Sequence, residues 1–312
     1  MNEISLDVQR VGLQLLAIDA ISLPPYKGSA LRGGFGHSFR KVACAIKRKD
    51  CDDCLLKHRC AYSYIFETPP PADSDLMRKY PRVPHPFVIE PPLEEKSKYE
   101  PGERLDFGLV LIGRAREYLP YFVYAFDELG NMGIGRGKGR YRLEKITCSG
   151  AVIYMAKDKV LGACTDVARF TRSDSPVPRL GIRFLTPTRI KFEERLAAEP
   201  EFHILIRNLL RRISSLSYFH CGKQLDLDFN GVIDRAGKVR QVRSAVEWVD
   251  WERYSSRQDT RMKLGGFVGE VEYEGDLQEF VPLLKAGEAV HIGKATSFGL
   301  GKYQILTQLP TP

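Results

Sequence analysis

The chain has 312 residues, of which 43% are hydrophobic and 10% aromatic, enough for a buried core and for two domains of ordinary size. Its 47 Lys and Arg residues outnumber 39 Asp and Glu, and the resulting net charge of +8 favours a polyanionic partner. No apolar run reaches the length of a membrane span, and no basic region followed by an apolar stretch opens the chain. We therefore expect a cytoplasmic protein with no membrane partner, in which the seven cysteines stay reduced.

The first half of the chain predicts the element order strand, helix, strand, strand, helix, strand. Alternating residues over 8–20 indicate a strand that Pro24 and Pro25 end. Apolar residues spaced three or four positions apart then predict a helix over 29–47. The remaining predicted elements of this half are strands over 86–91 and 104–112, a helix over 117–129 and a strand over 141–147.

The second half repeats this order. Its predicted elements are a strand over 180–190, a helix over 201–219, strands over 239–249 and 266–273, a helix over 277–286, and a closing strand from Lys302. The order predicts an α+β protein of two tandem ferredoxin-like (RRM-like) βαββαβ domains. We assign the domains to residues 1–165, with a cysteine-bearing insertion at 44–80, and to 178–312, after a polar, proline-bearing linker.

A glycine-rich segment occurs once in each half. Residues 117–143 and 279–305 align without a gap at a spacing of 162 residues. Five of the 27 positions are identical: Glu117/Glu279, Pro120/Pro282, Gly137/Gly299, Gly139/Gly301 and Tyr141/Tyr303. These identities fall at the helix start, the loop glycines and the following strand, so one supersecondary unit is used twice.

The two glycine-rich segments are candidate phosphate-binding loops. Glycines beside basic residues let the backbone approach a phosphate, because no side chain intervenes. Neither segment has the Walker or dinucleotide-binding pattern, and a tight helix-to-strand connection is an alternative explanation of the glycines. The candidate RNA-contacting residues are Arg136, Lys138, Arg140, Lys294, Ser297, Gly299, Gly301 and Lys302.

Four cysteines between residues 44 and 60 predict a metal site. Their spacing, C-x6-C-x2-C-x5-C, contains the C-x2-C turn that suits a tetrahedral ion, and His58 is a substitute ligand. The candidate ligands of a structural zinc ion or an iron-sulfur cluster are Cys44, Cys51, Cys54 and Cys60. The alternative is a set of free cysteines. Cys148, Cys164 and Cys221 are isolated and are expected to be core or surface residues.

His37 is the candidate catalytic base. It lies off the apolar stripe of the first predicted helix, on a face that also carries Arg40 and Lys41. RNA cleavage by the 2′-hydroxyl requires a group that removes a proton, a group that protonates the 5′-oxygen, and cations that stabilise the phosphorane. A solvated or capping histidine is the alternative. A second basic face, meeting either RNA or water, is predicted on the helix 201–219 by Arg207, Arg211 and Arg212.

With these motifs the sequence resembles the CRISPR-associated precursor-crRNA processing endoribonucleases of the RAMP superfamily. The segments that carry the resemblance are KATSFGLGKYQI, which ends at Ile305, YKGSALRGGFGHSF over 26–39 and PHPFVIEPP over 84–92. The four-cysteine passage is similar to that of the subgroup with a cysteine-bearing insert. The resemblance covers nearly the whole chain.

The resemblance implies a metal-independent endoribonuclease that cuts CRISPR repeat RNA once per repeat and leaves a 2′,3′-cyclic phosphate. His37 takes the role of the family's histidine, with Tyr26 and Lys27 as the nearby tyrosine and lysine. The implied partners are CRISPR repeat RNA, crRNA and subunits of a CRISPR effector complex. The alternatives are a non-catalytic RAMP subunit that binds crRNA in such a complex, or a zinc or iron-sulfur protein that serves another nucleic acid.

Overall fold

The computed structural model describes residues 3–47, 50–70, 83–165, 167–172, 175–250, 252–255 and 260–306. The part of the predicted cysteine insertion at 71–80 lies outside the described residues. The chain forms two compact units. The N-terminal unit comprises Val8–Val167 with Phe219–Cys221, and the C-terminal unit comprises Met1–Asp7, Ala168–Tyr218 and Gly222–Pro312.

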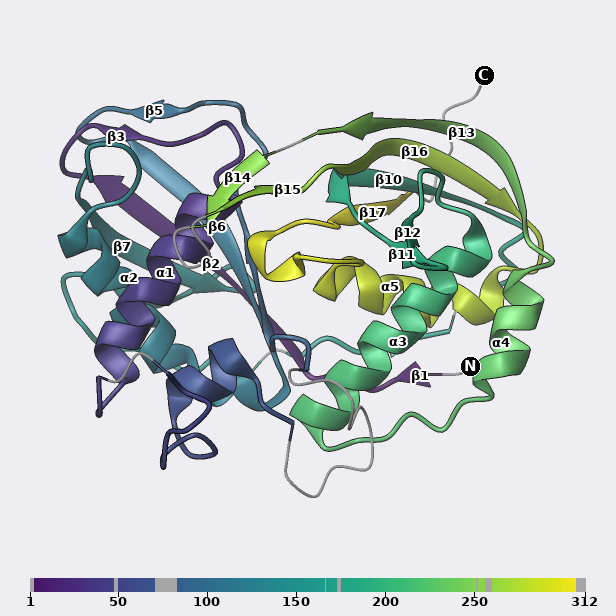
Figure 1. Ribbon diagram of the computed structural model, residues 1–312, viewed down its shortest axis with the longest axis horizontal. Coiled ribbons are helices and arrows are strands. Elements are labelled where there is room, and N and C mark those ends of the chain that lie inside the picture. Colours follow the sequence, from purple (N-terminus) through teal and green to yellow (C-terminus); the bar gives the residue numbers. More distant parts are fainter. Residues whose placement is uncertain are drawn as a thin grey trace. The chain divides into compact units, whose positions relative to one another are not determined.

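The N-terminal unit is built on an antiparallel sheet whose described strands have the order β4-β6-β2-β7-β8. Helices α1 and α2 pack against each other beside this sheet (Figure 1). The bounds of these elements are β2 Val8–Ala17, α1 Gly28–Ala43, β4 Phe87–Glu90, β6 Arg104–Ile112, α2 Leu119–Met132, β7 Tyr141–Cys148 and β8 Ala151–Met155. Without β8, this is the strand order of a ferredoxin-like βαββαβ unit.

The C-terminal unit repeats this topology, with the strand order β13-β16-β10-β17 in its described residues and antiparallel neighbours throughout. Its elements are β10 Arg179–Thr188, α3 Phe202–Cys221, α4 Phe229–Ala236, β13 Arg240–Val249, β16 Gly266–Glu274, α5 Val281–Val290 and β17 Tyr303–Leu306. The last three residues of α3 are grouped with the N-terminal unit. The two units confirm the predicted α+β fold of tandem ferredoxin-like domains.

Shorter elements complete the two units. Two-stranded pairings join β1 Glu3–Ile4 to β9 Phe170–Thr171, β3 Ile21–Ser22 to β5 Lys98–Tyr99, β11 Lys191–Phe192 to β12 Arg195–Leu196, and β14 Glu252–Ser255 to β15 Thr260–Lys263. The short helical turns are a π-helix η1 over Ser63–Glu67 and 3-10 turns η2 Gly113–Tyr118, η3 Gln278–Phe280 and η4 Thr296–Phe298. In the described residues, no helix is long and apolar enough to span a bilayer.

The repeated sequence segments have the same local architecture. Both α2 and α5 follow a 3-10 turn and carry proline in the first helical turn, where its missing N–H costs no hydrogen bond. The tyrosine of the strand after each glycine-rich loop is buried and donates a hydrogen bond to the preceding helix. The hydroxyl of Tyr141 bonds the Phe126 carbonyl at 2.8 Å, and that of Tyr303 bonds the Leu284 carbonyl at 2.5 Å. Each copy of the repeat therefore forms a helix, a loop and a strand, and the strand tyrosine is hydrogen-bonded to the helix.

An aromatic cluster forms the centre of the N-terminal unit. Phe35 of α1 is fully buried, and its ring stacks on Phe122 and Phe126 of α2 at centroid distances of 4.9 and 4.5 Å. Its edge-to-face partners include Phe87 of β4 at 5.8 Å. Stacked and edge-to-face ring pairs contribute stability beyond that of buried apolar area, so this cluster fixes α1 against α2 and the sheet. The polar face of α1 is consequently directed away from the core.

Candidate functional site

The first glycine-rich loop, residues 131–141, packs against the segment that follows β2. The Arg136 N–H donates to the Ser22 carbonyl at 2.9 Å, and the Ile134 N–H donates to the Gly139 carbonyl at 2.9 Å. Arg136 and Lys138 are exposed. Arg140 is also exposed, but its guanidinium binds both carboxylate oxygens of Asp19, at 2.7 and 3.2 Å. Two cations of this loop thus face solvent, and the third is partly neutralised by Asp19.

The second glycine-rich loop, residues 291–302, is tied to its own unit by backbone hydrogen bonds. The Thr186 hydroxyl donates to the Gly299 carbonyl and accepts from the Lys302 N–H, both at 2.9 Å. Gly301 has a φ of 72°, and a Cβ there would overlap the Ile292 carbonyl, so glycine is required for this close approach. Ser297, Gly299 and Gly301 are buried, whereas Lys294 is exposed. The glycines of this loop therefore have a packing role within the unit.

Arg212 of α3 anchors the beginning of that loop. The sequence places Arg212 on a solvent-facing surface with Arg207 and Arg211, but the structure buries its side chain, which is 8% exposed. Its guanidinium donates to the Val290 carbonyl at 2.6 and 3.1 Å and to the His291 carbonyl at 2.9 Å. Burial lowers the pKa of Arg212 to about 9, so the group is still protonated at neutral pH. A cation at the C-terminus of α5 satisfies carbonyls that have no partner within the helix.

The three predicted catalytic residues do not meet at one position. His37 is exposed on the polar face of α1. Lys27 is fully buried at the start of α1, and its amine donates to the Pro25 carbonyl at 3.1 Å and the Glu94 carbonyl at 2.6 Å. Burial lowers the pKa of Lys27 and raises that of Tyr26. Ten residues of helix separate Lys27 from His37, a rise of about 15 Å, and the Lys27 amine is held by the Pro25 and Glu94 carbonyls. The two side chains therefore do not lie together in this structure.

The cations near His37 have partners on neighbouring elements. The Arg32 guanidinium lies 4.3 Å from the ring centre of Phe66, and that of Arg40 lies 5.2 Å from the ring centre of Tyr62. Lys41 forms an ion pair with Glu128 of α2. Stacked guanidinium groups keep their charge. His37 therefore lies about one helical turn from Arg40, whose charge is held beside the Tyr62 ring.

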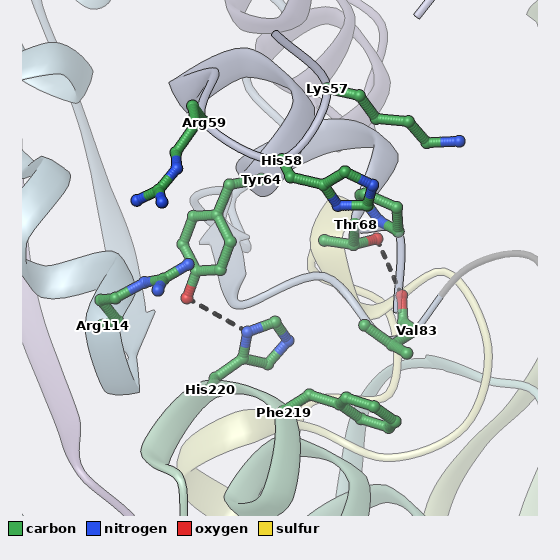
Figure 2. Close-up of a pocket in the computed structure, with 10 residues that line it drawn as sticks. Lys57, His58, Arg59, Tyr64, Thr68, Val83, Arg114, Phe219 and His220 are labelled. Atoms are coloured by element: carbon green, nitrogen blue, oxygen red, sulfur yellow. Dashed lines mark hydrogen bonds between the residues drawn. The ribbon is translucent and has the colours of Figure 1, made fainter. Parts of the chain in front are cut away.

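A pocket lies in the N-terminal unit between η1, η2 and the last residues of α3 (Figure 2). It encloses about 350 Å³ and is lined by Lys57, His58, Arg59, Tyr64, Thr68, Pro69, Val83, Arg114, Phe219 and His220. Among these ten described residues are three cations and two imidazoles, and none is acidic. The pocket is therefore a region of positive potential with an aromatic wall.

Tyr64 and His220 form the polar centre of the pocket. The Tyr64 hydroxyl lies 3.2 Å from Nδ1 of His220, and Nε2 of His220 lies 2.8 Å from the Pro84 carbonyl oxygen. Because a carbonyl can only accept, Nε2 carries the proton of the neutral imidazole, and Nδ1 accepts from the Tyr64 hydroxyl. Burial raises the pKa of Tyr64 well above its usual range, although the Arg114 charge and hydrogen bond act in the opposite direction. The tyrosine is neutral at physiological pH.

The comparisons with known proteins match both units. A family profile for an N-terminal domain, AF_1859_N, matches residues 6–165, which is more than half of the chain, and the profile of CRISPR-associated endoribonuclease Cas6 matches residues 182–303.

The N-terminal unit belongs to the AF_1859_N family, and the C-terminal unit contains a domain of the CRISPR-associated endoribonuclease Cas6 family.

Individual relatives of this Cas6-family chain are distant in sequence. An uncharacterized protein of Archaeoglobus fulgidus is 24% identical over 296 residues, which cover 91% of this chain and 92% of the relative. The product complex of a Thermus thermophilus Cas6 is 16% identical with a TM-score of 0.59, covering 96% of this chain and 100% of that one. A partial Cas6-RT-Cas1–Cas2 complex is 13% identical with a TM-score of 0.58, covering 98% of this chain and 47% of that one. These likenesses show a shared fold.

The four predicted metal ligands are partly buried free thiols after α1. Within residues 50–60 the chain makes tight turns, with the Cys54 N–H donating to the Cys51 carbonyl at 3.3 Å. Burial raises the pKa of Cys51, and the neighbouring thiols Cys44 and Cys60 add to this increase. Across the described residues, however, no group of three or more Cys, His, Asp or Glu side chains is arranged to hold a metal ion. The subgroup with a four-cysteine insert therefore stays a prediction.

Cys148 and Cys164 are joined by a disulfide, with their Cα atoms 6.0 Å apart. The expectation that these cysteines are isolated is wrong. The β7–β8 hairpin and the turn after it reverse the chain, and the Gly162 N–H donates to the Ile153 carbonyl at 2.7 Å. This reversal returns Cys164 to the strand that carries Cys148, a proximity that a separation of 16 residues does not reveal.

Sequence patterns carry no direct signal for Tyr64, Arg114 or His220 of this Cas6-family chain. The passage CAYSYIFE reads as the end of the cysteine segment, and a position at a helix end is enough to explain His220. A usable signal is the run of aromatic residues over 62–66, because such a run cannot all face the core of one helix. The structure accommodates these aromatic residues in a π-helix. This form is rare in proteins as a whole, but where it occurs it is often at a functional site.

Replacing Arg212 with Met should lower the free energy of unfolding of the C-terminal unit by about 1.5–3 kcal/mol, because buried carbonyls at the end of α5 lose a charged donor. Urea unfolding followed by tryptophan fluorescence measures this, since Trp248 and Trp251 are the two tryptophans of the chain. The exposed neighbour Arg211 is the matched control, and Arg211→Met should change stability by less than about 0.5 kcal/mol. Equal stability of the two variants would contradict the anchoring role of Arg212.

Proposed function

We propose that this Cas6-family protein cleaves CRISPR repeat RNA within precursor transcripts to give crRNAs. The observation that carries the proposal is the Cas6 profile match over residues 182–303, because it includes the second glycine-rich loop. The fold similarity to a Cas6 product complex supports an RNA-cleaving role, as do the net charge of +8 and the exposed cations of the loops. Subunits of CRISPR complexes are proposed as further partners, since a Cas6-RT-Cas1–Cas2 assembly has the same fold in its Cas6 part.

The proposed chemistry is transesterification by the neighbouring 2′-hydroxyl. A base removes the 2′-proton, the 2′-oxygen attacks the adjacent phosphorus, and the bond to the 5′-oxygen breaks as an acid protonates that oxygen. The products are a 2′,3′-cyclic phosphate and a 5′-hydroxyl, so atoms and charge balance without a metal ion. His37 is the proposed base because it is exposed on the polar face of α1, and an imidazole can both accept and donate a proton.

Lys27 and Tyr26 would act at some distance from His37. The amine of Lys27 would first have to leave the carbonyls of Pro25 and Glu94, which exchanges two hydrogen bonds for one phosphate contact. Arg40, about one turn of α1 from His37, is a nearer candidate for stabilising the phosphorane, because its guanidinium is held beside the Tyr62 ring. The proposed catalytic surface is therefore the polar face of α1.

The exposed loop cations are proposed to hold the RNA backbone. Arg136 and Lys138 extend from the first loop into solvent, and Lys294 does so from the second. Arg140 retains part of its charge beside Asp19, and Lys302 lies at the loop's end. Ser297, Gly299 and Gly301 are buried within the second loop, and hydrogen bonds to their own unit hold the loop that carries Lys294 and Lys302. Phosphate neutralisation of this kind gives affinity without sequence specificity.

A structural metal at Cys44, Cys51, Cys54 and Cys60 is a further part of the proposal. Its support is the C-x2-C turn and the proximity of Cys44 and Cys60 to Cys51, whose pKa burial and then these two thiols raise. Thiolates at this spacing suit zinc or an iron-sulfur cluster. A closed four-thiolate shell has no position for substrate, so the metal would stabilise the segment after α1 and take no part in cleavage.

Purified protein should cut a CRISPR repeat RNA once per repeat in the presence of EDTA, and His37→Ala should slow the cut by about 10²–10⁴-fold, the usual contribution of a general base. Single-turnover gel assays measure the rate. His203→Ala, which removes a histidine from the C-terminal unit, should leave it unchanged. A normal cleavage rate for His37→Ala would show that another residue is the base. RNA binding without cleavage by the wild-type protein would favour the non-catalytic RAMP subunit, because binding needs no proton transfer.

Replacing Arg136 and Lys138 with Gln should weaken the binding of RNAs of different sequence, all by a similar factor. The slope of log affinity against log salt concentration should become shallower by about 0.7–0.9 for each phosphate that the variant leaves unneutralised, because fewer counterions are released. Filter binding at four or more salt concentrations gives the slope. Arg104→Gln, an exposed arginine at the start of β6, serves as the control. A slope that is the same for both variants would show that the loop does not contact phosphate.

Protein purified without oxygen should contain one zinc ion or one iron-sulfur cluster per chain, and Cys54→Ser should lower this content because one of four ligands is removed. Elemental analysis and the visible absorption spectrum distinguish the two metals. Cys221→Ser is the control, since Cys221 lies outside the four-cysteine segment. Metal-free wild-type protein with normal thermal stability would contradict the metal site. Metal content is measured again after EDTA treatment, so that loss of structural metal is not mistaken for loss of catalysis.

A further inference from the structure

We propose that the pocket formed by Tyr64, Arg114 and His220 binds the phosphate group of a nucleotide. The phosphate can come from RNA or from a free mononucleotide. Only the first of these two sources rests on the proposed function. Lys57, Arg59 and Arg114 line one cavity, whose ten described lining residues include no carboxylate. An oxyanion would compensate this concentration of positive charge.

Arg114 is the central cation of the site. It follows Gly113, whose φ is 57°, and a Cβ on Gly113 would overlap the carbonyl of His220. Only glycine permits the backbone of η2 to approach the end of α3 so closely, and this approach places Arg114 at the edge of the pocket. The Arg114 guanidinium stacks on the Tyr64 ring, 4.4 Å from its centre. A stacked guanidinium keeps a planar fork of N–H donors, which suits two oxygens of one phosphate.

The other two cations come from the segment after the cysteines. Lys57 lies 3.7 Å from a carboxylate oxygen of Asp52, but that carboxylate is 65% exposed and the pair is weak. Arg59 is exposed at the rim of the pocket. Figure 2 shows Arg59 on the same side of the pocket as Arg114, beside Tyr64, whereas the amine of Lys57 lies on the other side of the view. A ligand anion would therefore meet Arg114 and Arg59 first.

The Tyr64–His220 pair fixes the inner wall. His220 is 5% exposed, and both its ring nitrogens have partners in the pocket wall, the Tyr64 hydroxyl and the Pro84 carbonyl. The imidazole cannot rotate without breaking these bonds, so it holds the phenol in one orientation. His220 is thus a positioning residue for Tyr64, and Tyr64 in turn supports the guanidinium of Arg114.

The size and apolar side of the cavity favour a nucleotide over a bare inorganic ion. The volume of about 350 Å³ is several times that of a water molecule, about 30 Å³ in the liquid, and lies in the range of small-molecule sites. Pro69 is among the lining residues, and in Figure 2 Phe219 and Val83 lie on the side away from Arg114. A base and sugar can occupy this apolar side while the phosphate meets the cations.

Unusual backbone conformations occur at the same place. Tyr64 lies in the π-helix Ser63–Glu67, and Thr68, which follows it, has a φ of 43° although it is not glycine. The Thr68 hydroxyl donates to the Val83 carbonyl at 2.9 Å and so secures this conformation. Such backbone persists only where the surroundings hold it, and it clusters at active sites and ligand-binding sites. A ligand site accounts for the charge, the shape and the strained backbone together.

Calorimetric titration of the full chain with adenosine 3′-monophosphate and with adenosine tests the proposal. The monophosphate should bind, and adenosine should bind at least about tenfold more weakly, since it lacks the group that receives charged hydrogen bonds. Arg114→Gln should weaken monophosphate binding by about tenfold or more, Arg114→Lys should weaken it less, and Arg104→Gln should have no effect. Circular dichroism and the thermal midpoint of each variant confirm that it is folded.

Competition with repeat RNA identifies the source of the phosphate. If RNA displaces the monophosphate, the site takes a phosphate of the RNA itself, and if both bind together it takes a free nucleotide. Equal binding of adenosine and the monophosphate, or full monophosphate binding by folded Arg114→Gln, would overturn the proposal. Cleavage of repeat RNA by the wild-type protein is scored separately, so a failed phosphate site and a failed endoribonuclease assignment give different results.

Discussion

Close backbone approach is the constraint on which both candidate sites depend. At Gly113 the η2 turn meets the carbonyl of His220, and at Gly301 the second glycine-rich loop meets the carbonyl of Ile292, in each case too closely for any Cβ. Both residues also have positive φ, which glycine adopts without cost. The first approach shapes the pocket around Arg114, and the second holds a loop in which Lys294 is exposed. Glycine therefore serves here to position neighbouring cations.

Charge is distributed differently in the two sites. In the loops, the cations are on the surface, where solvent screens them and where they can follow a long backbone by many weak contacts. In the pocket, the cations surround one cavity with an aromatic wall, an arrangement that suits a single phosphate held in a defined orientation. Arg212 is a third case, since its buried charge is satisfied by carbonyls at the end of α5 and stabilises the fold. A basic composition alone does not separate these roles.

The sequence predicted elements whose signal is local. The apolar spacing of α1, the paired Pro120 and Pro282, and the glycine loops all lie within short windows, and the structure confirms the two ferredoxin-like units that they indicate. The pocket was not predictable, because Tyr64 and His220 are 156 residues apart and only the folded chain brings them together. Arg212 was misplaced because helical periodicity defines a face but does not show that α5 ends against it. The disulfide was not predicted because Cys148 and Cys164 become neighbours only when the chain folds.

The central claim is that this Cas6-family chain cuts RNA through the 2′-hydroxyl. Mass spectrometry of the fragment upstream of the cut tests it most directly, using a repeat RNA and the same RNA with a single 2′-deoxy nucleotide before the scissile phosphate. The account predicts a 2′,3′-cyclic phosphate from the first RNA and no cut in the second. A 3′-hydroxyl end, or cleavage of the deoxy-substituted RNA, would contradict it.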